Sequence, residues 1–349
     1  MKRKNNFVSI FKNIKYNFKT ISSLIICIII CIIICILESC DNKTIKEVVL
    51  KENINIDEFS DSTFFSDIRS ICFSDSLYYA TDYSRDQVFV LDKNFKLIRT
   101  LGNKGQGPGE FLGAGHLNIN NDSVFVINDM KKTFEIFNNL EHIGTVTYAD
   151  GTRPNSNYRF FEYNGCLFYN PSVSQYSICK YNFNSKKVDF FGNIIKYNTA
   201  KETRIKNHRH ILRYNNRIIA VPDCQPIIEV YDFEGKFLNS VDFSNLKPVA
   251  EMLKFILGTE QKENTYYGFN KDVVVYKNSL YILILTAGID NKPKSNSILE
   301  FKIVGNNFVP SNLYHLGDGY FNTINVSEQG IETYNTRMNQ LKRYKYETK

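Results

Sequence analysis

One glycine-rich segment, residues 101–111, constrains the fold most, because it joins two stretches of the chain that are alike. Short runs of β-branched and aromatic residues alternate with polar turns before it, at 77–100, and the same order returns after it, at 124–138. Asp82 and Asp129, which end equivalent runs, are 47 residues apart. A strand-rich repeat of this length is typical of the blades of a β-propeller.

Further copies of the pattern indicate six blades. After the first two, they lie at residues 166–182, 218–238, 273–302 and 323–346. One such sheet cannot bury both of its faces alone, whereas six sheets in a ring bury a face between each pair of neighbours. We therefore expect an all-β, six-bladed propeller of four-stranded antiparallel blades. N- and C-terminal strands would close the ring, the former at 47–50 or 54–56.

Residues 248–258 depart from the strand pattern. The segment has Pro at its start and Gly at its end, and Val249, Met252 and Ile256 would share one side of a helix. We expect one short helical insertion here, between the fourth and fifth blades. Packing on the rim of the propeller and capping of the channel mouth both remain open.

The charge of the chain lies mostly in its leader. The formal net charge is +7, but residues 1–39 hold six cations and one anion, which leaves 37 cations and 35 anions in the remainder. No basic stripe is interleaved with aromatic residues. A body so close to neutral argues against nucleic acid as a partner.

Residues 1–39 have the composition of a secretory signal peptide. The first 20 residues are basic and polar, and residues 21–37 are almost all Ile, Leu and Cys. The following Leu37-Glu38-Ser39-Cys40 resembles a bacterial lipobox, although Glu38 departs from its usual small or hydroxylated residue. The resemblance implies cleavage before Cys40 and lipidation of Cys40, with palmitate among the acyl chains.

The apolar run leaves a second interpretation open. Its 17 residues are just long enough to span a bilayer, so the leader could be retained as an anchor. In both cases the rest of the chain is tied to a membrane in a bacterial cell envelope, facing the periplasm or the cell surface. The expected organisation is a signal peptide at 1–39, a linker at 40–45 and the propeller at 46–349.

The cysteines of the body do not indicate a zinc knuckle or a thioredoxin-like site. They are Cys72, Cys166, Cys179 and Cys224, and no CxxC motif occurs. Cys166 and Cys179 flank a predicted hairpin turn symmetrically. A disulfide across that hairpin and buried free thiols both remain open.

The stretch 77–111 resembles the NHL repeat, and signal plus domain resemble the bacterial six-bladed β-propeller lipoproteins. In that family, ligands bind over the central channel, on the face that carries the turns between second and third strands and the connectors between blades. The resemblance implies a binding face that carries Tyr83, Arg85, Lys104, Lys131, Lys132, Arg153, Arg159 and Arg209. Asp82 and Asp129 are expected to accept backbone N–H bonds that close their turns.

Metal catalysis is the alternative that the same resemblance implies. Some NHL-like propellers are zinc lyases that gather histidines around the axis, and others are calcium-dependent lactone hydrolases. The candidate ligands here are His116, His208, His210 and His315, of which the middle two would face one side of a strand. No HxxH, HExxH or nucleophile elbow occurs, and packing roles for these histidines are the simpler interpretation.

The sequence therefore predicts a binding module rather than an enzyme, without a cofactor unless Zn or Ca serves the alternative. Besides the membrane, its partner would be a small molecule, a glycan, a peptide or an envelope protein. Tyr83 would stack on the ligand while Arg85, Lys131, Lys132 and Arg153 donate charged hydrogen bonds. A purely structural scaffold that contacts proteins through blade edges is a third possibility.

Overall fold

The computed structural model describes residues 45–59, 63–171, 175–259, 266–288 and 292–345. The chain divides into Met1–Ile45 and Lys46–Lys349, and the described strands and helices all belong to the second unit. The predicted signal peptide, the lipidation site Cys40 and most of the predicted linker lie outside the described residues. Within the described residues, every helix is too short or too polar to cross a membrane.

The described strands of Lys46–Lys349 form six sheets in chain order, numbered here sheet 1 to sheet 6. Sheet 1 contains β3 (Ile68–Ser74), β4 (Leu77–Asp82), β5 (Gln87–Leu91) and β6 (Leu97–Leu101). Sheet 2 contains β7 (Ala114–Asn120), β8 (Ser123–Asn128), β9 (Thr133–Asn138) and β10 (Glu141–Thr147). Sheet 3 contains β11 (Phe161–Tyr163), β12 (Cys166–Tyr169), β13 (Ile178–Asn182) and β14 (Lys187–Phe191).

The other three sheets repeat this order. Sheet 4 contains β15 (Arg209–Tyr214), β16 (Arg217–Pro222), β17 (Ile227–Asp232) and β18 (Phe237–Asp242). Sheet 5 contains β19 (Asn270–Tyr276), β20 (Ser279–Ala287), β21 (Pro293–Val304) and β22 (Asn307–His315). Sheet 6 contains β23 (Phe321–Ser327), β24 (Gly330–Asn335) and β25 (Gln340–Lys345).

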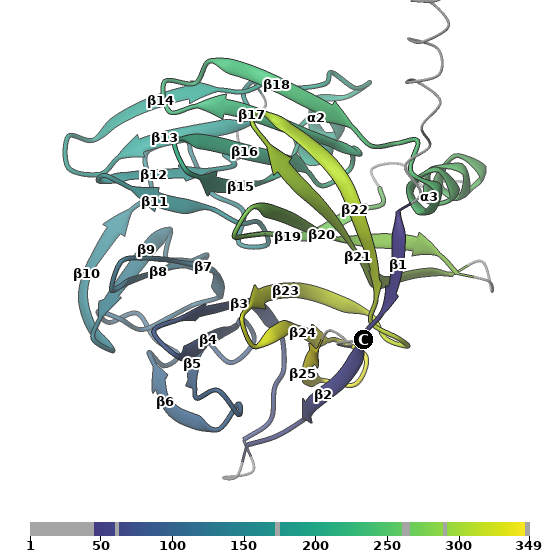
Figure 1. The fold of residues 1–349 in the computed structure, drawn as a ribbon. Helices are drawn as coiled ribbons and strands as arrows, with labels where there is room; N and C mark the ends of the chain where they lie inside the picture. Colours follow the sequence, from purple (N-terminus) through teal and green to yellow (C-terminus); the bar gives the residue numbers. More distant parts are fainter. Residues whose placement is uncertain (1–44, 60–62, 172–174, 260–265, 289–291, 346–349) are drawn as a thin grey trace, which may run out of the picture. The chain divides into compact units, whose positions relative to one another are not determined.

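The first strand of each sheet, called its inner strand, lies next to the inner strands of both neighbouring sheets. Contacts run from β3 through β7, β11, β15, β19 and β23 and back to β3, which closes the ring (Figure 1). The predicted six-bladed propeller is therefore confirmed.

Two N-terminal strands complete the sheets. β2 (Lys51–Ile56) pairs antiparallel with β25 and becomes the fourth strand of sheet 6, so strands from both ends of the domain close the ring as predicted. β1 (Lys46–Val49) instead pairs in parallel with β22 and makes sheet 5 five-stranded, which the sequence did not indicate. The sequence left two N-terminal segments open as the strand that closes the ring, and the structure uses the later one.

The hydrophobic core lies between neighbouring sheets. Between sheets 2 and 3, for example, Phe134 packs on Phe160 and Tyr169 in a cluster of buried aromatic and aliphatic side chains. The second strands are buried almost throughout, because both of their faces meet another sheet. The ring thus buries faces that a single sheet would expose.

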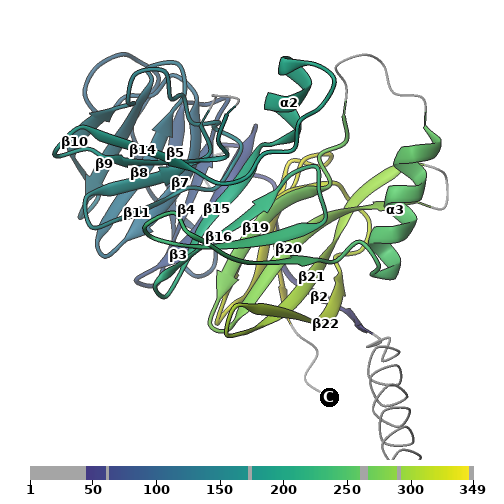
Figure 2. The ribbon, with the colours of Figure 1, turned by 90° about the horizontal axis from the view of Figure 1, so that it is seen from above.

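Two helices interrupt the strand order. α3 (Lys247–Gly258) is the predicted insertion, and its contacts are with β20, the second strand of sheet 5. Figure 2 shows α3 alongside β20 and away from β3 and β7, so it packs on the side of the ring. α2 (Ala200–Lys206), which was not predicted, begins at Thr199, whose hydroxyl accepts a bond from the Glu202 N–H.

The described cysteines are free thiols. Strand register places Cys179 opposite Tyr169 and Cys166 opposite Asn182, so the two cysteines of the hairpin are not cross-strand partners. Of the two alternatives left open by the sequence, the structure has the thiols.

Candidate functional site

A buried ion pair crosses the centre of the ring. Arg159 is 7% exposed, and it donates from Nε to Oδ1 of Asp272 at 2.8 Å and from Nη2 to Oδ2 at 2.7 Å. Nη2 also donates to the carbonyl oxygen of Ile324 at 2.6 Å. The two side chains come from sheets 3 and 5 and the carbonyl from sheet 6, so the pair joins three sheets across the axis.

Neutral histidines flank this pair. The ring centroids of His116 and His210 are 6.4 Å apart, and Nδ1 of His210 is 3.8 Å from Oδ1 of Asp272. Burial lowers the pKa of His116 to about 3 and that of His210 to about 4. Burial would raise the pKa of Asp272, but the Arg159 guanidinium holds it far below its usual range. These four side chains, called the central layer here, therefore hold one compensated charge pair and two uncharged imidazoles.

A cavity of about 380 Å³ lies at the end of the channel where the inner strands begin, called the entry end here. All six sheets or the segments leading into and out of them contribute to its wall. The lining residues are Asp67, Arg69, His116, Asn157, Tyr158, Asp223, Tyr266, Gly268, Lys271 and Asn322. Its volume lies within the range of small-molecule sites, roughly 300–1,000 Å³.

The wall of this cavity holds two acidic and two basic side chains. Arg69 pairs with Asp67 at 3.0 Å, and the Tyr158 hydroxyl donates to Oδ2 of Asp223 at 2.6 Å. Burial raises the pKa of the Asp223 carboxyl. The chain approaches this carboxylate closely at Gly268, where a Cβ would lie 2.4 Å from Oδ1 of Asp223. The lining as a whole favours a ligand without net charge.

Two polar atoms at the cavity lack a partner in the described part of the chain. They are Nδ1 of His116, a residue that is 2% exposed, and Oδ1 of Asn322. A buried polar atom without a hydrogen bond is costly, so each such group needs an explanation. A ligand or ordered water in the cavity would satisfy both.

Part of the predicted binding face lies beside this cavity. The Arg69 guanidinium lies 3.4 Å from the ring centroid of Tyr83, whose hydroxyl donates to Oδ2 of Asp129 at 3.0 Å. Arg153 donates to Oδ1 of the same aspartate at 2.7 Å, with half of its side chain exposed. The structure thus brings Tyr83 and Arg153 together, and Arg69 links them to the cavity.

The two turn aspartates differ from each other. Asp82 accepts backbone N–H bonds from Ser66, Asp67 and Arg85, as predicted. Asp129 accepts from side chains instead, so its predicted turn-closing role is wrong. Asn128 takes that place in sheet 2, because its Oδ1 accepts the N–H of Leu112.

Lys131 supports the glycine-rich connector. Its Nζ donates to the carbonyl oxygens of Gly107 and Glu110 at 2.9 and 3.0 Å. The connector needs glycine at Gly102, where φ is +68° and a Cβ would lie 2.4 Å from the Phe111 ring. Lys131 is therefore committed within the fold rather than offered to a ligand.

The remaining face residues are not gathered at the cavity. Lys104 and Lys132 are exposed. Arg85 lies in the turn after Asp82, with its guanidinium 5.4 Å from the ring centroid of Phe64. None of the three lines the cavity at the entry end.

Two predicted binding arginines belong to the interior. Arg209 has no exposed surface, and its Nε donates to Oε2 of Glu229 at 2.9 Å within sheet 4. It cannot contact a ligand on the face, so that prediction is wrong. Arg159 lies in the central layer beneath the cavity rather than on the face. Both are interior because each has a carboxylate partner on another strand, which the sequence alone does not reveal.

The four candidate metal ligands do not converge. His315 lies on the outer strand β22, where Nε2 is 3.6 Å from the Glu47 carboxylate, and the His208 ring packs on Tyr158. Across the described residues, no group of three or more His, Cys, Asp or Glu side chains could hold a metal ion. The donor set expected for the metal alternative is therefore not assembled.

Sequence reasoning missed Arg69, Tyr158, Asp223, Lys271, Asp272 and Asn322. A signal for several of them is present. A polar or charged residue recurs near the start of the inner strands, as at Arg69, His116, His210 and Asp272. Such residues face the axis where the sheets converge, so their recurrence points to the channel.

Residues 39–282 match the family described as 6-bladed beta-propeller, DUF5128. The chain belongs to this family. A search of curated proteins gave no match.

Solved structures agree on the fold. A DUF4221 family member from Bacteroides vulgatus superposes with a TM-score of 0.56 at 10% identity, over 85% of this chain and 97% of that chain. A candidate exported protein from Bacteroides fragilis gives 0.54 at 12% identity, over 83% and 88%. Virginiamycin B lyase from Staphylococcus aureus gives 0.52 at 10% identity, over 85% and 99%. At such identities the similarity concerns the fold alone.

Proposed function

We propose that this chain is a lipid-anchored propeller of the bacterial cell envelope that binds a small polar ligand without net charge in the cavity at its entry end. The observation that carries the proposal is the composition of that cavity. Every sheet contributes to it, its charges balance, and Nδ1 of His116 and Oδ1 of Asn322 lack partners in the described chain. Ligand sites typically combine a preformed concave wall with a few convergent polar groups.

Binding rather than catalysis fits the same groups. Tyr158 and Asp223 bond to each other, and burial raises the pKa of both. The Arg159 charge is taken up by Asp272 below the cavity. No Ser, Thr or Cys is among the described residues that line this cavity, so the commonest nucleophiles are not offered to a ligand there. The metal alternative is less well supported because no three of its candidate ligands gather around one point among the described residues.

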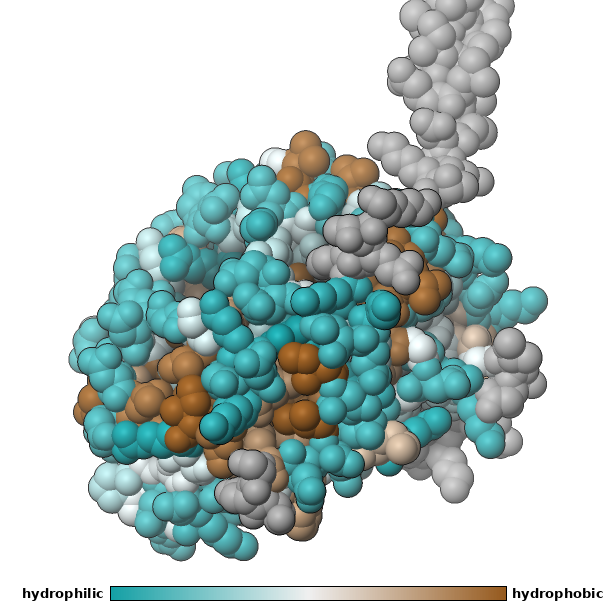
Figure 3. Space-filling model, turned by 60° about the horizontal axis from the view of Figure 1, so that its bottom comes forward, coloured by the Kyte–Doolittle hydropathy of each residue, from teal (hydrophilic) through white to brown (hydrophobic). Residues whose placement is uncertain are grey.

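A small ligand also fits the surface. On the face shown in Figure 3, hydrophilic residues predominate and the hydrophobic ones form separate patches. Large continuous apolar patches are the usual mark of a protein interface. On this face the structure therefore favours a ligand in a cavity over a partner on a broad apolar surface.

Binding is tested in a thermal-shift assay on the full-length chain in detergent. The panel contains sugars and amino acids without net charge, and dicarboxylates as the charged comparison. Asn157→Trp places a bulky ring at the cavity wall. Lys104→Trp, the control, introduces the same ring at an exposed residue that does not line the cavity. We expect compounds without net charge to raise Tm for the wild type and Lys104→Trp, but not for Asn157→Trp. Stabilisation that survives Asn157→Trp, or mass-spectrometric turnover of a stabilising compound, would contradict the proposal.

The anchor has its own test. The family match begins at residue 39, next to the predicted lipidation site, and a fold neighbour is described as a candidate exported protein. We expect mass spectrometry of the wild type to find an acylated Cys40 at the N-terminus and residues 1–39 removed. Cys40→Ala should lose the acyl chains and keep residues 1–39, because the predicted cleavage depends on that cysteine. A wild type that keeps residues 1–39 and carries no acyl chain would instead show that the apolar run is the anchor.

A further inference from the structure

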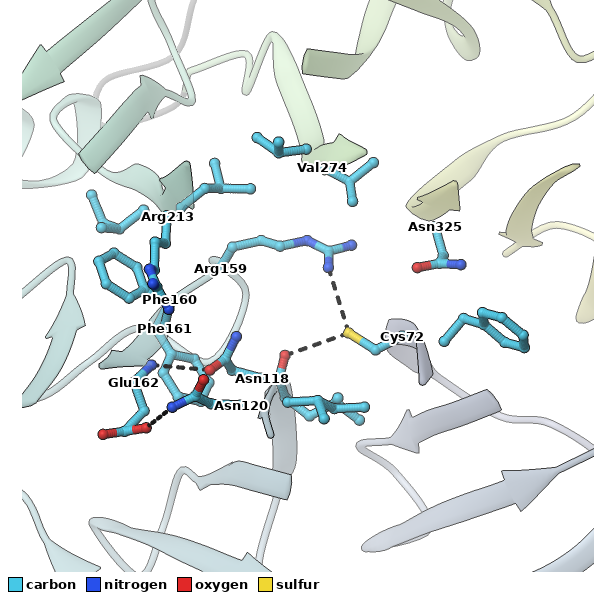
Figure 4. A pocket seen from close by; sticks show the side chains of 16 residues that line it. Cys72, Asn118, Asn120, Arg159, Phe160, Phe161, Glu162, Arg213, Val274 and Asn325 are labelled. Atoms are coloured by element: carbon cyan, nitrogen blue, oxygen red, sulfur yellow. Dashed lines mark hydrogen bonds between the residues drawn. The ribbon is translucent and has the colours of Figure 1, made fainter. Parts of the chain in front are cut away.

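A second cavity, of about 280 Å³, lies at the opposite end of the channel, where the inner strands end (Figure 4). It takes its wall from the last residues of the inner strands, including Cys72, Asn118, Glu162, Val274 and Asn325. None of its lining residues lines the cavity at the entry end. The layer of Arg159, Asp272 and the two histidines lies between them, so the channel has two separate cavities.

Arg159 supplies a hydrogen-bond donor to this second cavity, called the exit-end cavity here. Its Nε and Nη2 donate to Asp272 and a backbone carbonyl, whereas Nη1 has, among the described residues, only the sulfur of Cys72 as an acceptor, at 3.8 Å. A thiol sulfur is a weak acceptor. Arg159 and Cys72 both line the cavity, and Figure 4 shows the guanidinium directed toward Cys72. An oxygen acceptor bound here would be a better partner for Nη1 than the thiol.

The charges at this end favour a neutral acceptor. Asp272 already compensates Arg159 through two hydrogen bonds, and the other charged lining residues, Glu162 and Arg213, have opposite signs. A carboxylate placed on Nη1 would lie close to Asp272 without an unpaired cation to offset it. A carbonyl oxygen accepts the same N–H without that repulsion.

Carboxamides and apolar side chains both line the cavity. Asn118 accepts the backbone N–H of Glu162 through Oδ1, and its amide nitrogen has no partner among the described residues. Asn325 stands on another strand, and its amide nitrogen bonds to Glu332. Ile211 and Val274 provide apolar surface. Carboxamides both donate and accept, which matches an amide group, and the apolar wall matches a short aliphatic side chain.

We propose that the exit-end cavity is a second binding site, which takes a small uncharged ligand carrying an amide or equivalent carbonyl and a short aliphatic group. The carbonyl accepts from Nη1 of Arg159, the amide meets the Asn118 carboxamide, and the aliphatic group packs on Val274. This site is independent of the proposed function at the entry end, since the two cavities share no residue.

Saturation-transfer NMR on the full-length chain in detergent tests the proposal with two probes, N-acetyl-L-valinamide and its carboxylate counterpart N-acetyl-L-valine. We expect saturable binding of the amide and at least about tenfold weaker binding of the carboxylate. Val274→Phe, which fills the cavity, and Asn118→Leu, which removes the carboxamide, should each weaken amide binding at least about tenfold. Asn193→Leu, the same change at an exposed residue after β14 that does not line the cavity, should leave it unchanged.

Three outcomes overturn the proposal: no saturable binding of the amide, equal or tighter binding of the carboxylate, or binding that survives both cavity variants. A failure of either cavity variant to fold is detected by its thermal unfolding curve, and the other variant then decides. Because Asn157→Trp alters only the entry-end cavity, the two sites can succeed or fail separately.

Discussion

Arg153 and Arg159 lie six residues apart, and each pairs with an aspartate, but in opposite surroundings. Arg153 reaches Asp129 on the entry face, with 51% of its side chain exposed. Arg159 holds Asp272 through two hydrogen bonds in the centre of the ring, with 8% of its side chain exposed. An exposed pair contributes about 0–1 kcal/mol, whereas removing one partner of a buried pair costs about 3–5 kcal/mol. The same two residue types therefore serve different purposes.

The difference follows from their places in the propeller. Arg153 lies in the connector between sheets 2 and 3, where water solvates a charge and a ligand could reach it. Arg159 lies where the inner strands converge, and a charge there needs a fixed partner from another sheet. The exposed pair can respond to a ligand, while the buried pair separates the two cavities and holds the sheets around them.

The largest expected effect comes from breaking the central pair. Asp272→Asn leaves the Arg159 charge buried without its counterion, so we expect the free energy of unfolding to fall by about 3–5 kcal/mol in urea titrations. Asp129→Asn, the same change in the exposed pair, should cost about 1 kcal/mol or less. Equal losses in the two single variants would refute the contrast.

Acid should weaken the buried histidine layer. Burial lowers the pKa of His116 to about 3 and of His208 and His210 to about 4, from 6.5 in the unfolded chain. Between these values the unfolded state binds more protons, so stability falls as pH falls from about 6.5 to about 4. Each histidine contributes about 1.4 kcal/mol per pH unit to that slope. The Asp272 contribution is lost only below the unfolded carboxyl pKa of 3.8.

Urea titrations across this range check the slope. His116→Gln and His210→Gln should each flatten it, whereas Arg153→Ala should leave it as it is. Burial raises the pKa of three carboxyls, those of Asp82, Asp223 and Glu332, which changes stability with pH in the opposite sense. These carboxyls are present in every one of these proteins, so the difference from the wild type isolates the histidines. An unchanged slope in both histidine variants would show that the imidazoles are not held neutral.

The fold was predictable because its signals are local. Strand alternation, polar turns and the glycine-rich connector each lie within a short stretch, and the repeat length then indicates a propeller. The extra strand β1 was not predictable, because a parallel pairing with β22 leaves no local mark on Lys46–Val49. The short helix α2 was missed as well, since its length falls below that of a clear helical period.

The site was predictable only in part, because burial depends on distant partners. Asp272 is 113 residues from Arg159, and the sequence near either residue does not indicate that the two pair. Arg209 and Arg153 look alike in the sequence, yet one is enclosed with Glu229 and the other is half exposed. Basic residues near blade boundaries therefore indicate the channel region without indicating which of them a ligand can reach.

Two neighbouring lysines test the same distinction between enclosed and exposed charges, and the expected effect on stability is of intermediate size. Lys131 donates to two carbonyls of the connector and lies 3.1 Å from Glu135, whose side chain is fully buried, whereas Lys132 is exposed. We expect Lys131→Met to lower the free energy of unfolding by about 1–3 kcal/mol and Lys132→Met to change it by less than about 0.5 kcal/mol. Urea titration of both variants measures the difference. Equal effects would show that Lys131 does not support the connector.

The smallest effect on stability is expected at the exposed Arg153–Asp129 pair. The dependence of this effect on salt distinguishes it from the effect of breaking the buried pair. Arg153→Ala should lower the free energy of unfolding by about 1 kcal/mol or less in dilute buffer. At about 1 M salt the Debye length falls to about 3 Å, so the loss should nearly vanish, while the loss caused by Asp272→Asn should persist because that pair is shielded from ions. Urea titrations at low and high salt compare the two. A loss at Arg153 that is large and independent of salt would place this pair with the buried one and remove the contrast between the entry face and the centre of the ring.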